Sequence, residues 1–164
     1  MDDQQQLVLR ASQHPNNVIA RLGFDLRHRY LEECWAPVIG PASVLLLRRL
    51  PDLWRNEEPA RLTAGDLGRH LGLAGSGTEH TLRRLERFGF ARFGQTGEVE
   101  VFTTAGPVHA DQLDRLPPAS RVEHHRMVAD QFATALDPDR NSATVSRRLD
   151  QLQNRSRPHL HLVR

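Results

Sequence analysis

Basic side chains recur along residues 76–88 at a spacing that suits contact with nucleic acid. A guanidinium group can donate two hydrogen bonds at once to a phosphate or to the edge of a guanine. Several such groups on one side of a helix are therefore typical of a DNA-contacting surface. The residues of this stretch that can do this chemistry are His80, Arg83, Arg84 and Arg87.

The apolar residues of the same stretch predict which side the basic residues occupy. Thr78, Leu82 and Leu85 recur at helical spacing, so we expect them to face the protein interior. The helix N-terminus would also offer unpaired backbone amides to a phosphate. The positions left on the outer or lateral sides are Ser76, Gly77, His80, Arg83, Arg84 and Arg87.

The outward residues divide by position into two expected roles. Ser76, His80 and Arg84 follow one another every four residues on one side, which makes them the candidates for contact inside a DNA groove. Arg83 and Arg87 are expected at phosphates or in local pairs with acidic neighbours. The alternative for each arginine is an ordinary solvated surface charge.

A short helix is predicted before this stretch, separated from it by a tight turn. Thr63 can cap that helix, with Asp66 in the reciprocal capping position. Gly72 can take the left-handed conformation that ends a helix. Each helix is too short to be stable alone, so each needs a neighbour's apolar surface. The pattern is that of a helix-turn-helix.

A β-hairpin is predicted directly after the second helix. Residues 90–93 and 99–103 alternate apolar and polar side chains, and residues 94–97 supply glycines for a turn between them. A hairpin over residues 90–103 would lie beside the second helix. The hairpin residues expected to reach the DNA backbone or minor groove are Arg92, Gln95 and Thr96.

This order of elements resembles the winged helix-turn-helix family, and within it the MarR-type bacterial regulators. The motifs that carry the resemblance lie in residues 41–106 and read VLLLRRL, TAGDLGRHLGL, RRLERFG and TTAG. The resemblance implies a mainly α fold with a three-helix core, a hairpin wing and flanking N- and C-terminal helices. It also implies a sequence-specific regulator, a dimeric repressor that inserts the 76–88 helix in the major groove of double-stranded DNA.

The predicted organisation has three parts. Residues 1–40 are expected to form a loose polar arm over 1–17, with one helical turn at 7–11, followed by one or two helices over 18–34. Residues 41–106 form the winged module, opened by a helix over 42–54 that Pro51 kinks or ends. A short strand at 61–62 is expected to join the wing.

Residues 107–164 form the third part. Helices are expected over 107–116, 119–136 and 142–153, followed by a frayed tail. The resemblance implies that the terminal helices pair two copies of the chain, which would place two recognition helices about one DNA turn apart. The alternative is that they only complete a monomer core. The inward face predicted for the 119–136 helix consists of Val122, Ala129, Phe132, Ala133 and Leu136.

Composition is that of an ordinary soluble protein, and it adds little to the DNA interpretation. The 164 residues carry a net charge of +2 with histidine neutral, and all 22 basic residues are arginine. The first residues are acidic and polar, unlike a signal peptide, and the apolar run at 44–47 is too short to span a membrane. We therefore expect a cytoplasmic protein without membrane contact.

Neither catalysis nor a cofactor is predicted. The sequence has no glycine-rich phosphate loop, nucleophile elbow or H-E-x-x-H motif, so we do not expect an enzyme. The nine histidines include the pairs 124–125 and 159/161, but neither pair supplies three converging ligands, so no metal site is expected. The single cysteine, Cys34, follows two glutamates and precedes a tryptophan, which favours a buried, unreactive thiol.

Two questions stay open at this level. A winged helix can also bind a protein, so an adaptor in replication, partition or transcription is the alternative function. Gly77 and Glu79 favour it, because an acidic group near the start of the second helix would repel phosphate. No residue identifies a small-molecule effector, although folds of this type can hold one between the winged module and the dimer helices.

Overall fold

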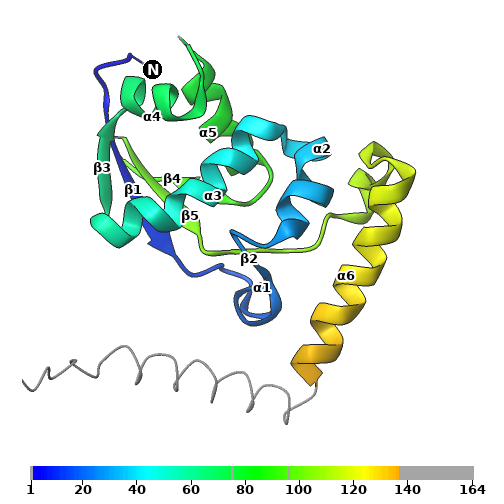
Figure 1. Ribbon diagram of the computed structural model, residues 1–164. Helices are drawn as coiled ribbons and strands as arrows, with labels where there is room; N and C mark the ends of the chain where they lie inside the picture. Colours follow the sequence, from blue (N-terminus) through cyan, green and yellow to red (C-terminus); the bar gives the residue numbers. More distant parts are fainter. Residues whose placement is uncertain (1, 75, 96, 137–164) are drawn as a thin grey trace, which may run out of the picture.

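Helices and a small β-sheet share one hydrophobic core in the computed structural model, which describes residues 2–74, 76–95 and 97–136 (Figure 1). The fold is mixed α/β, with more residues in helices than in strands. The strands are β1 (Gln6–Ser12), β2 (Phe24–Asp25), β3 (Ala60–Thr63), β4 (Ala91–Phe93), β5 (Glu98–Phe102) and β6 (Thr104–Ala105). The helices are α1 (Asn17–Leu22), η1 (Leu31–Trp35), α2 (Ala36–Ile39), α3 (Pro41–Asn56), α4 (Ala64–Leu71), α5 (Gly77–Arg87), η2 (Ala110–Arg115) and α6 (Pro118–Leu136).

The N-terminal segment is a strand, and the prediction of a loose arm with a helical turn at 7–11 is wrong. Strand β1 lies inside a four-stranded sheet of order β3-β1-β5-β4, antiparallel to β3 and parallel to β5. Leu7 and Leu9 are completely buried, whereas Gln6 and Arg10 are exposed. Because side chains alternate along a strand, β1 turns its leucines to the core and its polar residues to solvent.

The predicted strand at 61–62 exists as β3, but β1 separates it from the hairpin. Residues 90–103 do form the predicted hairpin, in which Ala91 pairs with Val101 and Phe93 with Val99. The sheet is therefore larger than the single wing hairpin that was expected, and the fold is less purely α. A second, two-stranded sheet joins β2 to β6, where Phe24 pairs with Ala105.

Two prolines lie within helical segments, and Pro51 does not end its helix. Pro37 lies at the start of α2, directly after the π-helix η1. Pro51 lies within α3, which continues to Asn56. The side chains of Leu46, Leu47 and Leu50 are completely buried, so packing holds this helix together despite the hydrogen bond that Pro51 removes.

The helix pair α4–α5 has the capping and turn chemistry that the sequence predicts. The Asp66 N–H donates to Thr63 Oγ1 over 3.0 Å, and the Thr63 hydroxyl donates to Asp66 Oδ2 over 2.7 Å. Gly72 ends α4 with φ +67°, in the left-handed region. Across the helix contact, the buried Thr78 hydroxyl donates to the Ala64 carbonyl over 3.2 Å. Side-chain and backbone contacts thus fix the angle between the helices.

Replacing Gly68 by alanine is expected to destabilise the protein by about 1 kcal/mol or more, because overpacking costs more than alanine gains as a helix former. A Cβ at this position would lie 2.8 Å from Thr78 Oγ1 and 3.2 Å from the Leu73 carbonyl oxygen. Urea denaturation measures the change, with the exposed Arg69→Ala on the same helix as the control. A Gly68→Ala protein as stable as the control would show that the two helices are not in this close contact.

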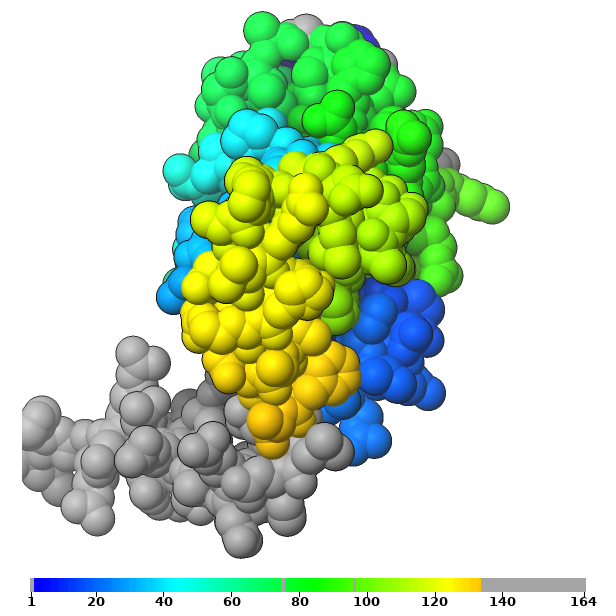
Figure 2. Space-filling model, turned by 90° about the vertical axis from the view of Figure 1, so that its right-hand side faces the viewer, coloured from blue at the N-terminus to red at the C-terminus, as the bar shows by residue number. Residues whose placement is uncertain are grey.

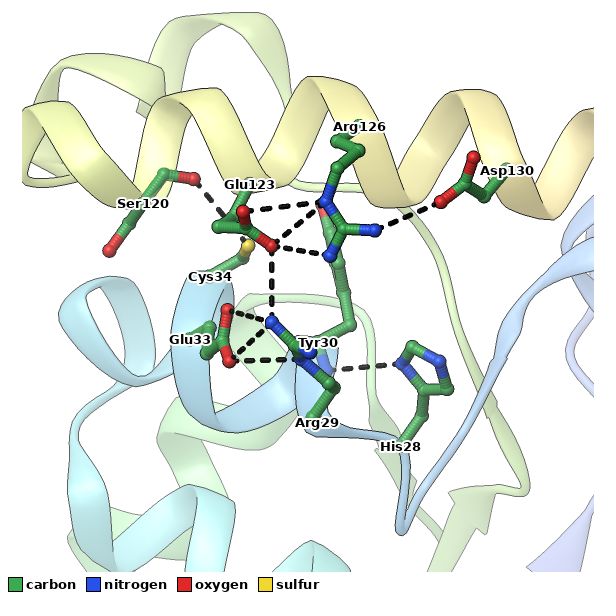
Figure 3. Close-up of polar contacts among 9 residues, drawn as sticks. All are labelled: His28, Arg29, Tyr30, Glu33, Cys34, Ser120, Glu123, Arg126 and Asp130. Carbon is green, nitrogen blue, oxygen red and sulfur yellow. Dashed lines mark hydrogen bonds and ion pairs between the residues drawn. The ribbon is translucent and has the colours of Figure 1, made fainter.

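Helix α6 packs against the helix of residues 29–39, on the side of the molecule away from the sheet (Figure 1). The Val108 N–H donates to the Tyr30 hydroxyl over 2.9 Å, so the Tyr30 proton is directed to His124 Nδ1, 2.6 Å away. Charged side chains bracket this contact. Arg29 lies 3.1 Å from Glu123, and Glu123 lies 2.6 Å from Arg126 (Figure 3).

The inward face predicted for this helix is wrong at Val122, Ala129 and Ala133, which are exposed, whereas Phe132 is half-buried and the side chain of Leu136 is outside the described part. Among residues 118–133 of this helix, His124 and Met127 are buried, whereas Val122 is 67% exposed. The difference arises because the Tyr30 hydroxyl provides a buried hydrogen-bond partner for His124. The helix is therefore rotated so that His124, and not its aliphatic residues, faces the core. The segment expected to form a 3.6-residue helix at 107–116 is the 3-10 helix η2.

The free energy of unfolding is expected to fall as the pH is lowered from about 7 to about 5. Burial lowers the pKa of His124 from its ordinary value, with a further contribution from the neighbouring His125. As the pH falls, His124 is protonated in the unfolded chain before it is protonated in the folded chain, so acid favours unfolding. His124→Asn keeps an acceptor near the Nδ1 position and should reduce this pH dependence, whereas His125→Asn, at an exposed position, should change it less. Equal pH profiles for the two variants would contradict the assignment.

The predicted helix at 142–153, the tail and the histidines at 159 and 161 lie outside the described residues. Within the described part of the chain, no helix combines the length and apolar character needed to cross a membrane.

Candidate nucleic-acid interface

Helix α5 turns its apolar side inward and its basic side outward, as its spacing predicts. Leu82 and Leu85 are completely buried and Thr78 is 4% exposed, in a core shared with α3 and α4. A short helix is stable only if its apolar side is buried, so this packing leaves the opposite side of α5 exposed to solvent. The residues on its solvent-exposed side are Ser76, His80, Arg83, Arg84 and Arg87.

Gly77 differs from the other residues of this surface in its close contact with the preceding turn. It is half-buried, and a Cβ at this position would lie 3.2 Å from Leu73 Cβ. The absence of a side chain therefore lets the first turn of α5 approach the turn that precedes it. Gly77 therefore lies at the side of this surface, and it shapes the turn between the two helices.

Arg83 is held in place by the hairpin. Its Nη1 lies 3.2 Å from Glu86 Oε2, and its guanidinium carbon lies 4.1 Å from the centre of the Phe93 ring on β4. The backbone N–H of Phe93 donates to Glu86 Oε1 over 3.3 Å. These contacts join α5 to the hairpin through one arginine and one glutamate. The sequence predicted the pair with Glu86 but not the stacking on Phe93.

Arg84 lies against the C-terminal end of α2. Its Nη1 donates to the Ile39 carbonyl over 3.4 Å, and it would lie 2.9 Å from a Cβ added at Gly40. Gly40 has φ +83°, a backbone conformation that favours glycine. Arg84 is still exposed to solvent, and with His80 it borders a small hollow of about 130 Å³ at the start of α3.

Arg87 and Arg92 are the most available basic groups of the surface. Both are exposed, and neither forms an ion pair with another described residue. The guanidinium carbon of Arg87 lies 5.8 Å from the centre of the Phe88 ring. Arg92 is on β4, opposite Glu100 of β5. Gln95 is exposed at the hairpin turn, and Thr96 lies outside the described residues.

Strand β1 adds a residue that sequence reasoning missed. Arg10 lies opposite Glu100 in the parallel pairing of β1 with β5, and its Nη2 is 3.0 Å from Glu98 Oε1. Arg10 and Arg92 therefore flank the acidic strand β5 on the exposed face of the sheet. The sequence signal for this strand was weak, because only Leu7 and Leu9 mark its inward face and the residue between them is also apolar.

Cys34 is buried, as its sequence neighbours predicted. Its side chain is completely inaccessible, and its thiol lies 3.8 Å from the Ser120 carbonyl of α6 (Figure 3). Burial, together with the nearby carboxylates of Glu33 and Glu123, raises the pKa of the Cys34 thiol to about 12. A thiol with such a pKa is protonated at neutral pH, and a protonated thiol is a poor nucleophile.

Comparison of the chain with protein-family models, with curated proteins and with solved structures found no match.

Proposed function

We propose that the exposed side of α5 and the β4–β5 hairpin bind double-stranded DNA, as in a winged helix-turn-helix protein. One observation carries this proposal: α5 is anchored through its apolar side, while a histidine and three arginines occupy the side that the described chain leaves open. Exposed basic groups on a rigid helix suit both phosphate contact and reading of base edges.

The arrangement favours different roles for the basic residues. His80 and Arg84 lie one turn apart on α5 and suit the major groove. Arg87 and Arg92 suit the flanking phosphates, because no acidic partner holds them within the described chain. Arg83 stabilises the contact between helix and hairpin, so it would position the hairpin more than touch a base. Gln95 suits the DNA backbone beside the hairpin turn.

We further propose a dimeric regulator of the MarR-like kind, acting as a repressor. Support comes from α6, whose side away from the core exposes Val122 and Ala129 to solvent. Pairing two such helices would remove apolar surface from water and give two α5 helices related by a two-fold axis. Sedimentation of wild-type protein and of a Val122→Glu variant tests this, because a charge at the pairing surface should yield monomers.

The second candidate function is a protein-binding adaptor that uses the same surface. Acidic groups support it: Glu79 and Glu86 are on α5, and Glu98 and Glu100 are on the hairpin. A surface of mixed charge repels phosphate more than a purely basic one, but it can pair with charges on another protein.

Selection of bound fragments from a random pool of duplex DNA tests the proposed function. Purified full-length protein is expected to enrich a short palindrome, because a two-fold symmetric dimer reads two equivalent half-sites. Failure to enrich any sequence, with a folded protein, would contradict the sequence-specific regulator and favour the adaptor.

A further inference from the structure

A small hollow lies where the first turn of α3 meets the exposed side of α5. Its volume is about 130 Å³, and its lining includes Ala42 and Ser43 from α3 and His80 and Arg84 from α5. In Figure 2, the cyan surface of α3 borders the green surface of α4 and α5. Sites that hold drug-sized molecules measure roughly 300–1,000 Å³, so this hollow suits a single small group.

The α3 side of the hollow presents backbone donors. No side chain caps this 16-residue helix, and Pro41, its first residue, has no N–H. The next two N–H groups, those of Ala42 and Ser43, have no acceptor among the described residues. Because the N-terminus of a helix also carries a partial positive charge, this end of α3 favours an anion.

The side chain of Ser43 is a separate indication of a ligand. Ser43 is only 2% exposed and lines the hollow. Its hydroxyl forms no hydrogen bond with another described residue, and its oxygen keeps some accessible surface, so a group in the hollow can reach it. Leaving a buried hydroxyl unpaired is costly, and a bound group that accepts its proton would remove that cost.

The α5 side of the hollow is basic. Arg84 Nη1 donates to the Ile39 carbonyl over 3.4 Å, and the other N–H groups of this guanidinium have no hydrogen-bond partner among the described residues. His80 is exposed beside it. The described residues that line the hollow include no aspartate or glutamate. An anion in the hollow would therefore meet a guanidinium and a helix N-terminus without an opposing carboxylate.

We propose that this hollow binds one phosphate group of the DNA backbone, an inference that rests on the proposed function. The phosphate oxygens would accept hydrogen bonds from the Ala42 and Ser43 N–H groups, from the Ser43 hydroxyl and from Arg84. One guanidinium and one helix N-terminus match the single negative charge of a phosphodiester better than the two charges of free phosphate. Helix α3 is then a third element that contacts DNA, besides α5 and the hairpin.

Replacing Ala42 by aspartate tests the proposal, because it places a carboxylate at the hollow. The first turn of a helix favours an acidic side chain, so the melting temperature should stay the same or rise. The affinity for duplex DNA is expected to fall about tenfold, and the slope of its logarithm against the logarithm of salt concentration should become shallower by about 0.9 per bound chain. Fluorescence anisotropy with a labelled duplex measures both.

Asn17→Asp is the matched control. It changes the net charge by the same amount at an exposed position in the first turn of α1, outside the proposed DNA surface. Its affinity and salt slope should equal those of wild type. If wild type binds duplex DNA and Ala42→Asp binds it like Asn17→Asp, this inference is overturned and the proposed function stands. If wild type does not bind duplex DNA, both fail together.

Ser43→Ala is a second variant, which removes only the unpaired hydroxyl. Its melting temperature should equal or exceed that of wild type, because alanine favours a helix and no hydrogen bond within the described chain is lost. Its affinity for duplex DNA should fall about threefold. Unchanged affinity would remove the hydroxyl from the site.

Titration with inorganic phosphate distinguishes the two sources of a phosphate group. Amide chemical shifts of Ala42 and Ser43 are expected to respond only weakly to phosphate and strongly to duplex DNA. Saturation of these shifts by micromolar phosphate would assign the hollow to a free anion and overturn its assignment to DNA.

Discussion

Replacing Leu9 by aspartate is expected to leave the chain largely unfolded at 25 °C. Leu9 is completely buried at the centre of the sheet, where β1 pairs with both β3 and β5. A carboxylate there would lose its hydration without gaining a partner, at a cost of several kcal/mol, and the leucine contacts would be lost as well. Those losses are comparable to the whole stability of a typical domain, about 5–15 kcal/mol.

Circular dichroism and amide dispersion in NMR spectra measure this result. The matched control is Arg10→Ser, at the adjacent exposed position of the same strand, which should remain folded because it removes only an exposed ion pair with Glu98. A Leu9→Asp protein that keeps the wild-type melting temperature would show that β1 is not part of the sheet.

Replacing Arg87 and Arg92 together by alanine is expected to weaken binding to duplex DNA about thirtyfold, or about 2 kcal/mol, near physiological salt. Both side chains are exposed and without an ion pair in the described chain, so their removal withdraws phosphate contacts without exposing buried groups. The loss should be similar for different DNA sequences, because phosphate contacts carry no sequence information.

Fluorescence anisotropy with a labelled duplex measures the affinity. A double variant at Arg21 and Arg49, which are also exposed arginines, keeps the net charge equal to that of the first variant. Equal losses in the two variants would mean that DNA responds to total charge and not to this surface.

The parts of the fold that are local in sequence could be predicted, and the parts that depend on distant contacts could not. The helix at 77–87 follows from the spacing of Thr78, Leu82 and Leu85, and the hairpin from two alternating runs around a glycine turn. Strand β1 pairs in parallel with β5, which lies about ninety residues later in the sequence. No local sequence pattern predicts a pairing between segments so far apart. Its own alternation of leucines was too short to distinguish from a turn of helix.

The register of α6 was missed for a chemical reason. Counting apolar residues places Val122 and Ala129 inward, but the structure buries His124 because the Tyr30 hydroxyl, 94 residues away in sequence, offers it a hydrogen bond. A polar residue that is buried by a partner distant in sequence does not contribute to a hydrophobic period.

The sequence predicted which residues of the candidate surface are exposed, but not which neighbours they contact. The exposure of His80, Arg84 and Arg87 follows from helical geometry alone. The stacking of Arg83 on Phe93 and the close approach of Gly77 to Leu73 depend on how the hairpin and the turn pack on α5. Such packing requires the three-dimensional arrangement of elements.

The salt dependence of wild-type affinity for duplex DNA tests the central claim most directly. If the exposed side of α5 and the hairpin contact about four phosphates, the logarithm of the affinity should fall with the logarithm of salt concentration with a slope of about −3.6. Between about 50 and 200 mM salt the affinity would then fall roughly a hundredfold. An affinity that does not change with salt, or no affinity for duplex DNA at any salt concentration, would contradict the account.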